Sequence, residues 1–430
     1  MKLSPEKIAG LSPLRRDVIM RRSMEDVSEV HDYVRGILSE IRQNGDEPSL
    51  AWHRELKPDL APDDFRVQPE EIQEAYRQVP GDIVEALQKA AVNIRTFHAA
   101  QLERPMWQME VAPGIWAGRK HTPLDAVGCY VPGMRAVYPS TALMTVLPAL
   151  VAGVRRVVVT TPPDTGLKAN AYTLVACDIA GVSEIYKLGG PWAVGSLAYG
   201  TPTVPRVDKI VGPGNKYVTA AKMLVFGLVD IDSPAGPSEA LILADSTADP
   251  RWLALDFLSQ VEHDPDSAAV LVSDDAQLAQ AVCDEIERLY PSLPRREILE
   301  KAGRYCAVLV ADDMAHAVAF TNEYAAEHLQ IVTRDPFLTL QEIRNAGSIF
   351  LGPWAPVPVG DYASGTNHVL PTGQGARAFS GLSVDDFIKK PTFQYLSREG
   401  LASLAGTVET LATAEGLPIH AMTVKARLAD

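Results

Sequence analysis

Apolar residues recur every three or four positions along the first part of the chain. This period is that of an α-helix with one apolar face, and it predicts helices over 25–42, 69–79 and 83–102. The pair Pro80-Gly81 separates the last two segments. We therefore expect the chain to be helical up to about Pro123.

From Ala126 onward, short apolar runs alternate with helical segments. The runs predict two series of strands, at 126–131, 156–160, 184–188 and 207–211, and at 240–244, 268–272, 306–310 and 329–332. The helices predicted between them cover 142–151, 169–180, 193–198, 276–289 and 314–324, with one more ending at His263. Repeated strand–helix units form parallel sheets, so the fold class is α/β with a duplicated, Rossmann-like architecture. A short helical tail is expected over 392–428.

Composition adds the class of protein and its compartment. The chain has 430 residues, of which 47% are apolar and 22% charged, and this indicates a soluble globular protein with at least two domains. No stretch approaches the roughly 18 to 20 uninterrupted apolar residues of a bilayer span, and the N-terminus lacks an apolar leader. The net charge of −14 argues against nucleic acid or an anionic membrane as a partner.

The four cysteines, Cys129, Cys177, Cys283 and Cys306, are scattered without CxxC spacing. This usage is typical of a reducing cytoplasm, and buried apolar filler is the preferred interpretation of each thiol. We therefore expect a cytoplasmic protein whose metal ligands, if any, are not cysteines.

The segment 249–265 reads as a helix with an Asp249 cap and Pro250 in its first turn. Gln260 and His263 stand three residues apart, so both project from one side of the final turn. That spacing suits two metal ligands. Taken alone, a histidine that simply interacts with the helix dipole is the preferred alternative.

Two further segments carry groups for proton transfer or ligand binding. Glu327 and His328 adjoin at a helix end, where they could move protons or could be merely solvated. The segment 359–371 reads as a polar loop that includes Asp361 and His368, and a site and an ordinary loop are about equally supported. His420 becomes interesting only as a fourth member of a site with Gln260, His263 and Asp361.

A nucleotide site is indicated by the strand 207–211, which runs into Gly212-Pro213-Gly214-Asn215 and then a helix. Such a turn can bring backbone amides to a pyrophosphate. Tyr130 and the pair Gly189-Gly190 end neighbouring strands at the same sheet edge. There is no GxGxxG motif, and glycines that only allow helices to pack closely are the alternative.

Taken together and in this order, these segments resemble the histidinol dehydrogenase family over essentially the whole chain. The matching runs are Tyr130–Gly133, Tyr138–Thr141, Gly212–Asn215, Ala235–Glu239, Ser259–His263, Glu327–Leu329, Gly360–His368 and Ala414–Gly416. The run Gly360–His368 is highly specific.

The resemblance implies an NAD-dependent dehydrogenase that oxidises L-histidinol through L-histidinal to L-histidine, using two NAD in the last steps of histidine biosynthesis. It implies one Zn²⁺ per site, with the metal ligands Gln260, His263, Asp361 and His420, and proton transfer by Glu327 and His328. The implied substrate contacts are Ser238, Gln260, His263, His328, Asp361, His368, Glu415 and His420. The implied cofactor contacts are Tyr130 and Asn215.

The resemblance also implies a domain-swapped homodimer in which Glu415 and His420 reach the partner's site. It further implies that the chain has four parts. They are an N-terminal arm at 1–24, a first incomplete Rossmann-like domain at 25–128 and 239–380 that carries the zinc and catalytic residues, a second Rossmann-like domain at 129–238 that binds NAD, and a C-terminal helical tail at 381–430.

The chain departs from the family pattern at two places. Met134 follows Gly133 where the family commonly has a second glycine, and Trp192 replaces a glutamine that contacts the cofactor, so we count Trp192 among the cofactor-binding positions. A dehydrogenase of the same scaffold acting on another small polar alcohol or a sulfonated diol is therefore an alternative. From another class, a zinc hydrolase with Glu327 as base is a further alternative, which predicts turnover without NAD. An aldehyde dehydrogenase with a thiolate nucleophile is disfavoured, because no cysteine falls in the candidate segments.

Overall fold

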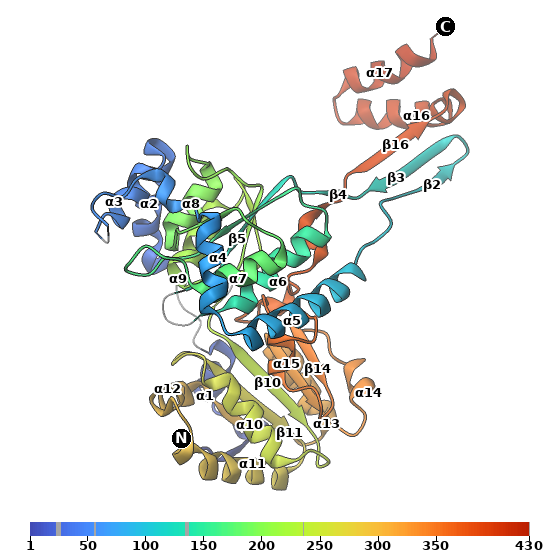
Figure 1. Ribbon diagram of the computed structural model, residues 1–430. Coiled ribbons are helices and arrows are strands. Elements are labelled where there is room, and N and C mark those ends of the chain that lie inside the picture. The colour runs from blue at the N-terminus through green and yellow to red at the C-terminus, as the bar shows by residue number, and fades with distance from the viewer. Residues whose placement is uncertain (23–26, 56, 134–136, 235, 430) are drawn as a thin grey trace. The chain divides into compact units, whose positions relative to one another are not determined.

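The computed structural model describes residues 1–22, 27–55, 57–133, 137–234 and 236–429. The chain forms two compact units. The first unit comprises Met1–Gln101 and Asp125–Phe387, and the second comprises Leu102–Leu124 and Ile388–Asp430. Both large parallel sheets of the chain lie in the first unit (Figure 1).

A five-stranded parallel sheet in the first unit has the strand order β7-β6-β5-β8-β9. Its strands are β5 (Ala126–Tyr130), β6 (Arg156–Thr160), β7 (Ile185–Tyr186), β8 (Lys209–Val211) and β9 (Asp230–Ile231). The helices that connect them are α6 (Pro139–Val151), α7 (Ala171–Ala180), α8 (Gly190–Tyr199) and α9 (Lys216–Val225). The chain starts at β5, moves to one edge and returns to β8, so a topological switch point lies between the carboxyl ends of β5 and β8.

A six-stranded parallel sheet has the order β1-β12-β11-β10-β13-β14. Its strands are β1 (Pro5–Lys7), β10 (Glu239–Ala244), β11 (Ala268–Ser273), β12 (Ala307–Val310), β13 (His328–Val332) and β14 (Ser348–Leu351). Its helices are α1 (Pro13–Arg21), α10 (Pro250–Val261), α11 (Ala276–Leu289), α12 (Arg296–Ala302), α13 (Met314–Tyr324), α14 (Pro336–Leu340) and α15 (Val357–Tyr362). Apart from β1, this sheet repeats the strand order of the first, in agreement with the duplicated architecture expected from the sequence.

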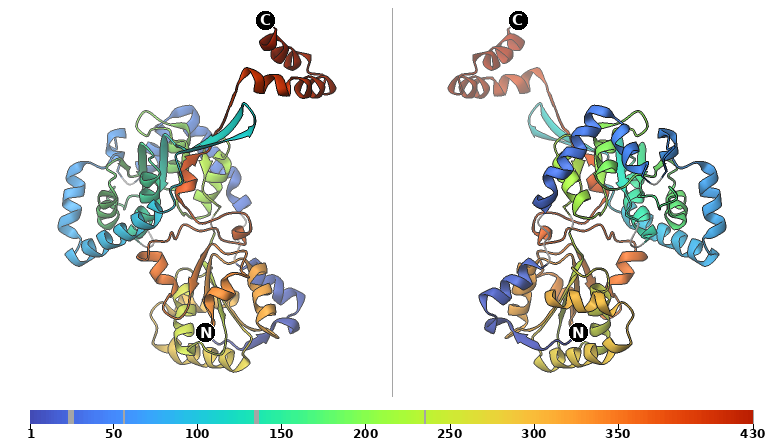
Figure 2. Two further views of the ribbon diagram at one scale, coloured as in Figure 1. Left: turned by 90° about the vertical axis from the view of Figure 1, so that its right-hand side faces the viewer. Right: turned by 90° about the vertical axis from the view of Figure 1, so that its left-hand side faces the viewer.

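Helices cover both faces of the six-stranded sheet (Figure 2). Along β10, Leu241 and Leu243 enter a core with α1 and α13, whereas Ile242 and Ala244 enter a core with α10 and α11. A strand buried on both faces is apolar at every position rather than at alternate ones. This explains why β10 and β11 are continuous apolar runs in the sequence.

The helices of the N-terminal part pack against the five-stranded sheet. Helices α2 (His31–Asn44) and α3 (Glu47–His53) share a core with α8 and α9 through residues such as Val34 and Leu197. On the other face, α4 (Pro69–Gln78) and α5 (Gly81–Ala99) contact α6 and α7. The apolar face of α2 thus packs on α8 and α9 of the five-stranded sheet. The predicted helix start at Glu25 and the end of the predicted arm at residue 24 lie outside the described residues.

The second unit is built from a small antiparallel sheet and a helical hairpin. It contains β2 (Met106–Ala112), β3 (Ile115–Lys120), β4 (Thr122–Pro123), β15 (Ile388–Lys389), β16 (Thr392–Leu396), α16 (Arg398–Ala414) and α17 (Pro418–Leu428). Strand β16 pairs with β3, and β3 pairs with β2. The prediction of a tail that is helical from residue 392 was wrong for β16, because its alternating aromatic residues, Phe393 and Tyr395, extend the β3 ladder instead.

The described chain has no helix with the length and apolar character needed to cross a membrane. All four cysteines are free and buried, as expected from their apolar surroundings in the sequence.

Candidate functional site

The predicted proton-transfer pair lies at the amino edge of the six-stranded sheet. Helix α13 ends at Tyr324, and Ala325 at φ 52° turns the chain toward β13, whose first residue is His328. Glu327 and His328 are 5% and 4% exposed. A solvated helix end, the alternative interpretation of this pair, is therefore wrong.

Glu327 is held by the neighbouring strand β10. The Glu239 backbone N–H donates to Glu327 Oε2 at 2.8 Å, and the Glu327 N–H donates to Glu239 Oε1 at 3.1 Å. These reciprocal bonds form because the register of β10 and β13 pairs Ala240 with His328, which places the two preceding glutamates side by side.

His328 lies between three acceptors. Its Nδ1 is 3.2 Å from the carbonyl oxygen of Glu239 and 3.4 Å from Glu327 Oε2, and its Nε2 is 3.3 Å from Asp361 Oδ1. Burial alone would lower the pKa of His328, but the carboxylates of Glu327 and Asp361 raise it well above its usual value. Burial alone would raise the pKa of Asp361, but its contact with His328 lowers it. The arrangement gives a buried imidazole flanked by two carboxylates.

Asp361 and His368 connect this edge to the five-stranded sheet. Asp361 lies in the last turn of α15, which begins at Val357 after the cap residue Pro356. The prediction of a loop over 359–371 was therefore wrong for residues 359–362, which are helical. His368 Nδ1 is 2.8 Å from the Asp361 carbonyl oxygen, and its Nε2 is 3.2 Å from Thr141 Oγ1 in the first turn of α6. Because α6 follows the carboxyl end of β5, the amino edge of one sheet meets the carboxyl edge of the other at His368.

Gln260 has the features of a ligand-binding residue. It lies in the last turn of α10 and is 1% exposed, and both its amide oxygen and its amide nitrogen lack a hydrogen-bond partner. Buried polar groups are normally paired, so these atoms fit a site for a metal ion or a polar substrate. His263 lies two residues after the end of α10.

The residues predicted to hold zinc are divided between the two units. Gln260, His263 and Asp361 belong to the first unit, whereas the fourth predicted ligand, the exposed His420, belongs to the second, as does the predicted substrate contact Glu415. Within the described ranges, no three His, Cys, Asp or Glu side chains are grouped as a metal site would require. Ser238, the remaining predicted substrate contact, is half-buried and directly precedes β10.

The predicted cofactor positions lie at the carboxyl ends of β5 and β8. Tyr130 ends β5, and its hydroxyl oxygen accepts from the Gly190 N–H at 3.2 Å. Asn215 caps α9 by accepting from the N–H groups of Tyr217 and Val218. This is the switch point of the sheet, the usual ligand position in such folds.

Gly212 allows the close approach of these two strand ends. Its φ is +118°, and a Cβ there would lie 2.1 Å from the Tyr130 carbonyl oxygen. The Gly212 N–H donates to Asp232 Oδ2 at 2.7 Å, and its carbonyl oxygen accepts from Lys222 Nζ at 3.0 Å. Lys222 and Asp232, which form a buried ion pair with each other, therefore hold the turn through these two hydrogen bonds.

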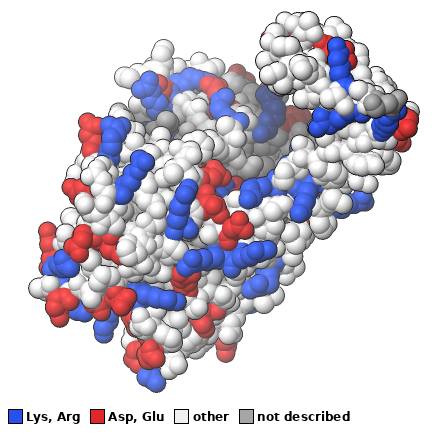
Figure 3. Space-filling model, turned by 90° about the horizontal axis from the view of Figure 1, so that it is seen from above, with Lys and Arg blue, Asp and Glu red and all other residues white. Residues whose placement is uncertain are grey.

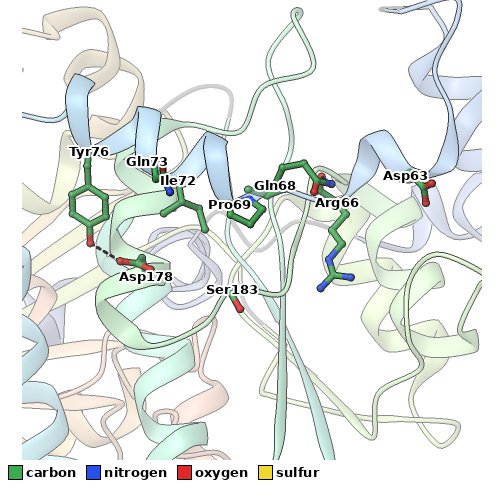
Figure 4. A pocket seen from close by; sticks show the side chains of 10 residues that line it. Asp63, Arg66, Gln68, Pro69, Ile72, Gln73, Tyr76, Asp178 and Ser183 are labelled. Atoms are coloured by element: carbon green, nitrogen blue, oxygen red, sulfur yellow. Dashed lines mark hydrogen bonds between the residues drawn. The ribbon is translucent and has the colours of Figure 1, made fainter.

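A cavity of about 750 Å³ lies elsewhere in the first unit, beside α4 and α7. Figure 4 shows Tyr76 pointing toward Asp178 at its wall, where the Tyr76 hydroxyl donates to Asp178 at 2.7 Å. Its lining, which includes Asp63, Arg66 and Ser183, contains none of the predicted site residues. On the face seen in Figure 3, acidic and basic side chains are interspersed.

The comparisons with known proteins decide the family. Residues 20–428 match the family model described as histidinol dehydrogenase. The chain belongs to the histidinol dehydrogenase family. The recognition from sequence motifs is thereby confirmed, and with it the classification of the chain as an oxidoreductase.

Relatives in this family match along their whole length. The chain is 50% identical over 428 residues to a histidinol dehydrogenase of Methanothermobacter thermautotrophicus, with 99% of each chain covered. It is 47% identical to one of Methanosarcina barkeri, with 98% of this chain and 97% of the relative covered. A crystal structure of histidinol dehydrogenase from Elizabethkingia anophelis, 36% identical, superimposes with a TM-score of 0.94 over 99% of this chain and 98% of that one. The α/β fold with parallel sheets is confirmed by this likeness.

Trp192, the departure from the family pattern, has a partner in this chain. Its ring stacks on that of Trp52 in α3, with centroids 4.3 Å apart and an interplanar angle of 21°. Trp192 lies in the first turn of α8, two residues after Gly190 at the sheet edge. The indole is thus held against α3. The other departure, Met134, lies outside the described residues, as does Ala235 of the Ala235–Glu239 run.

Two residues of the site were missed by sequence reasoning. Glu239 was part of a matching run, but no role was assigned to it, and Arg22 was not considered. Arg22 Nε is 2.9 Å from Glu239 Oε2, and these side chains are 2% and 3% exposed. In a sequence, one arginine among the four of 15–22 carries no mark of burial; only the tertiary packing distinguishes it.

Proposed function

We propose that this chain oxidises L-histidinol through L-histidinal to L-histidine with two NAD and one zinc ion per site, as the last steps of histidine biosynthesis. The observation that supports this most is the buried group of Glu327, His328 and Asp361 at the meeting of the two sheets. It provides two proton-transfer groups, Glu327 and His328, that are held in place away from water.

His328 serves as the base for the alcohol. As the hydroxyl carbon of R–CH₂OH gives up a hydride, the hydroxyl proton must leave, and the His328 imidazole, once deprotonated, takes it; the carboxylates that raise its pKa make it the stronger proton acceptor. Asp361 and Glu327 orient the ring and stabilise the charge that it gains. NAD supplies the hydride acceptor in each oxidation.

Glu327 serves the second oxidation. The aldehyde must first add water to form R–CH(OH)₂, because only then does its carbon again carry a hydride that can leave with an O–H proton. The Glu327 carboxylate takes a proton from that water, and the product acid leaves as a carboxylate. The hydrogen bond from Glu239 fixes Oε2 of this group.

The zinc ligands are Gln260, His263 and Asp361 with His420, and the substrate contacts include Ser238, His368 and Glu415. The unpaired, buried amide of Gln260 is the observation that fits such a site. Bound zinc would act as a template that holds the imidazole and amine of the substrate. The cofactor contacts are Tyr130, Asn215 and Trp192.

The active form is a homodimer with exchanged C-terminal segments. Large apolar side chains are exposed in the second unit, including Trp107, Met109, Val111, Ile419 and Met422. Such exposure is expected where a second copy covers the surface. The free, buried cysteines support a cytoplasmic location. The four-part division of the chain stays a prediction.

The decisive experiment measures NADH absorbance with the purified, zinc-loaded chain, NAD and L-histidinol, and with a few small diols. Two NADH per L-histidinol consumed, with histidine as product, is the expected result. NADH formation from a diol alone would mean that another small polar alcohol is the substrate. Hydrolytic turnover without NAD would mean a zinc hydrolase.

The roles of the two proton-transfer residues are tested by substitution. His328→Gln should lower the rate of alcohol oxidation by about 10²-fold or more while leaving zinc content intact. Glu327→Gln should slow aldehyde oxidation more than alcohol oxidation. An unchanged rate would remove His328 from the mechanism, and equal effects on both steps would remove the water-activating role of Glu327.

A further inference from the structure

Glu239 contacts both members of the proton-transfer pair. Its N–H donates to Glu327 Oε2 at 2.8 Å, its Oε1 accepts from the Glu327 N–H at 3.1 Å, and its carbonyl oxygen lies 3.2 Å from His328 Nδ1. It is the first residue of β10 and is 2% exposed. Glu239 thus fixes the position and orientation of both Glu327 and His328 at the start of the neighbouring strand.

Glu239 also creates an electrostatic difficulty. Two carboxyl groups, those of Glu239 and Glu327, stand side by side away from water, where like charges repel strongly. Burial raises the pKa of Glu239 to about 7, and the charge of Glu327 adds to this effect, whereas Arg22 opposes it. A cation beside Glu239 offsets part of the cost of burying two carboxyl groups together.

Arg22 is this cation, and it is held firmly. Its Nε lies 2.9 Å from Glu239 Oε2, its guanidinium carbon lies 3.6 Å from the centre of the Tyr324 ring, and Nη2 donates to the Tyr324 carbonyl oxygen. The residue adopts φ 55°, which an L-residue rarely does without compensation. Tyr324 ends α13, the helix that leads to Glu327.

We propose that Arg22 and Glu239 are positioning residues that hold the Glu327 carboxylate in the orientation needed for the activation of water. Arg22 balances the charge of Glu239, Glu239 fixes Oε2 and the backbone of Glu327, and the other oxygen of Glu327 is the one presented to water. The inference rests on the proposed role of Glu327. It assigns a role in the chemistry to α1, whose carboxyl end carries Arg22. Arg22 and its partner Tyr324 lie 302 residues apart in the chain.

The test is a double-mutant cycle on the purified, zinc-loaded full chain with NAD, measured separately with the alcohol and with the aldehyde. Glu239→Gln keeps the size of the side chain and an oxygen acceptor, but removes the charge that pairs with Arg22. It should lower kcat for the aldehyde by about tenfold or more, with KM for the alcohol changed less than about threefold. In a Glu327→Gln background the same substitution should produce no further loss, because the group that it positions is already inactive.

Arg22→Lys provides a second variant if Glu239→Gln folds poorly, because it keeps the charge and loses the guanidinium geometry. The matched control is Glu6→Gln, which removes another ion pair of α1 with the same sheet. Arg15 Nη2 lies 2.8 Å from Glu6 Oε1, and neither residue contacts Glu327. Glu6→Gln should lower the melting temperature without changing the ratio of aldehyde to alcohol rates.

The outcomes separate the two proposals. If Glu327→Gln slows the aldehyde step but the losses from Glu239→Gln multiply in full in that background, Arg22 and Glu239 are only structural and this inference is wrong. The same follows if Glu6→Gln reproduces the change in the rate ratio. If Glu327→Gln leaves the aldehyde step unchanged, the proposed role of Glu327 itself is wrong, and the positioning role falls with it.

Discussion

Gly212 combines a backbone conformation and a close contact that no other residue could satisfy together. Its φ of +118° is rare for L-residues, and the space of a Cβ is occupied by the carbonyl oxygen of Tyr130. The turn also places the cap of α9, Asn215, at the switch point of the sheet. The residue is therefore required by the turn itself, whatever ligand the turn binds.

Gly212→Ala should consequently separate the ends of β5 and β8. We expect the free energy of unfolding to fall by about 2 kcal/mol or more, since strained backbone and a steric clash act together, and KM for NAD to rise. Urea unfolding and initial-rate kinetics measure the two effects. Gly227→Ala, which also has a positive φ but an open Cβ position, is the control and should leave KM for NAD unchanged; a similar rise in both variants would argue against a cofactor role for the turn.

Individual residues also show the limits of sequence reasoning. The pair Gln260 and His263 could be selected because their spacing fits a helix turn, and Gln260 lies buried and unpaired in the last turn of α10. Arg22 and Glu239 could not, because charged residues are usually solvated and nothing local distinguishes a buried pair. Their contact joins α1 to β10, and that contact exists only once the six-stranded sheet has formed.

Among the elements, those with a strong local apolar pattern were the easiest to predict. The strand β6 and the helices α11 and α13 have the predicted bounds, since each has a strong apolar pattern and a clear start. In α11 and α13 the start is an aspartate whose side chain accepts from the first-turn N–H groups. Periodicity and capping are local properties, so the sequence is sufficient for them.

Elements that depend on a distant partner were missed. The edge strand β1 was not predicted. The expectation of a helical chain up to about Pro123 was wrong for the hairpin β2–β3, and β16 was also expected to be helical. Six of the seven residues of β2 are exposed, so no alternation of buried and solvated positions marks this strand. Strand β1 has three residues and is defined by its pairing with β12, 300 positions along the chain. Such strands exist because of long-range pairing, which a local pattern does not contain.

Considered as a whole molecule, the chain places its predicted site residues in two separate compact units. Glu415 and His420 belong to the helical hairpin of the second unit, together with exposed Leu411, Ile419 and Met422. A hairpin with so few buried residues of its own, such as Ala412, Ala421 and Val424, gains little stability by itself. Its function is expected to depend on a second copy of the chain.

Removal of residues 415–430 should abolish zinc occupancy, because His420 is lost, and should leave both parallel sheets folded. Metal analysis of the purified protein, together with its far-UV circular dichroism, measures the two effects. His420→Asn in the full chain serves as the matched variant, since it removes the ligand and keeps the hairpin. Zinc retained in both would show that His420 is not a ligand.

The four thiols offer a means to examine this hairpin in solution. They belong to sheet and helix interiors, and burial raises the pKa of each, so thiol-reactive reagents find no accessible thiolate in the folded chain. A cysteine introduced at Ala426, an exposed position of α17 outside the apolar surface described above, would then react alone. A spin label attached there would report distances between α17 hairpins of an assembled pair, without any need to remove the native sulfur atoms first.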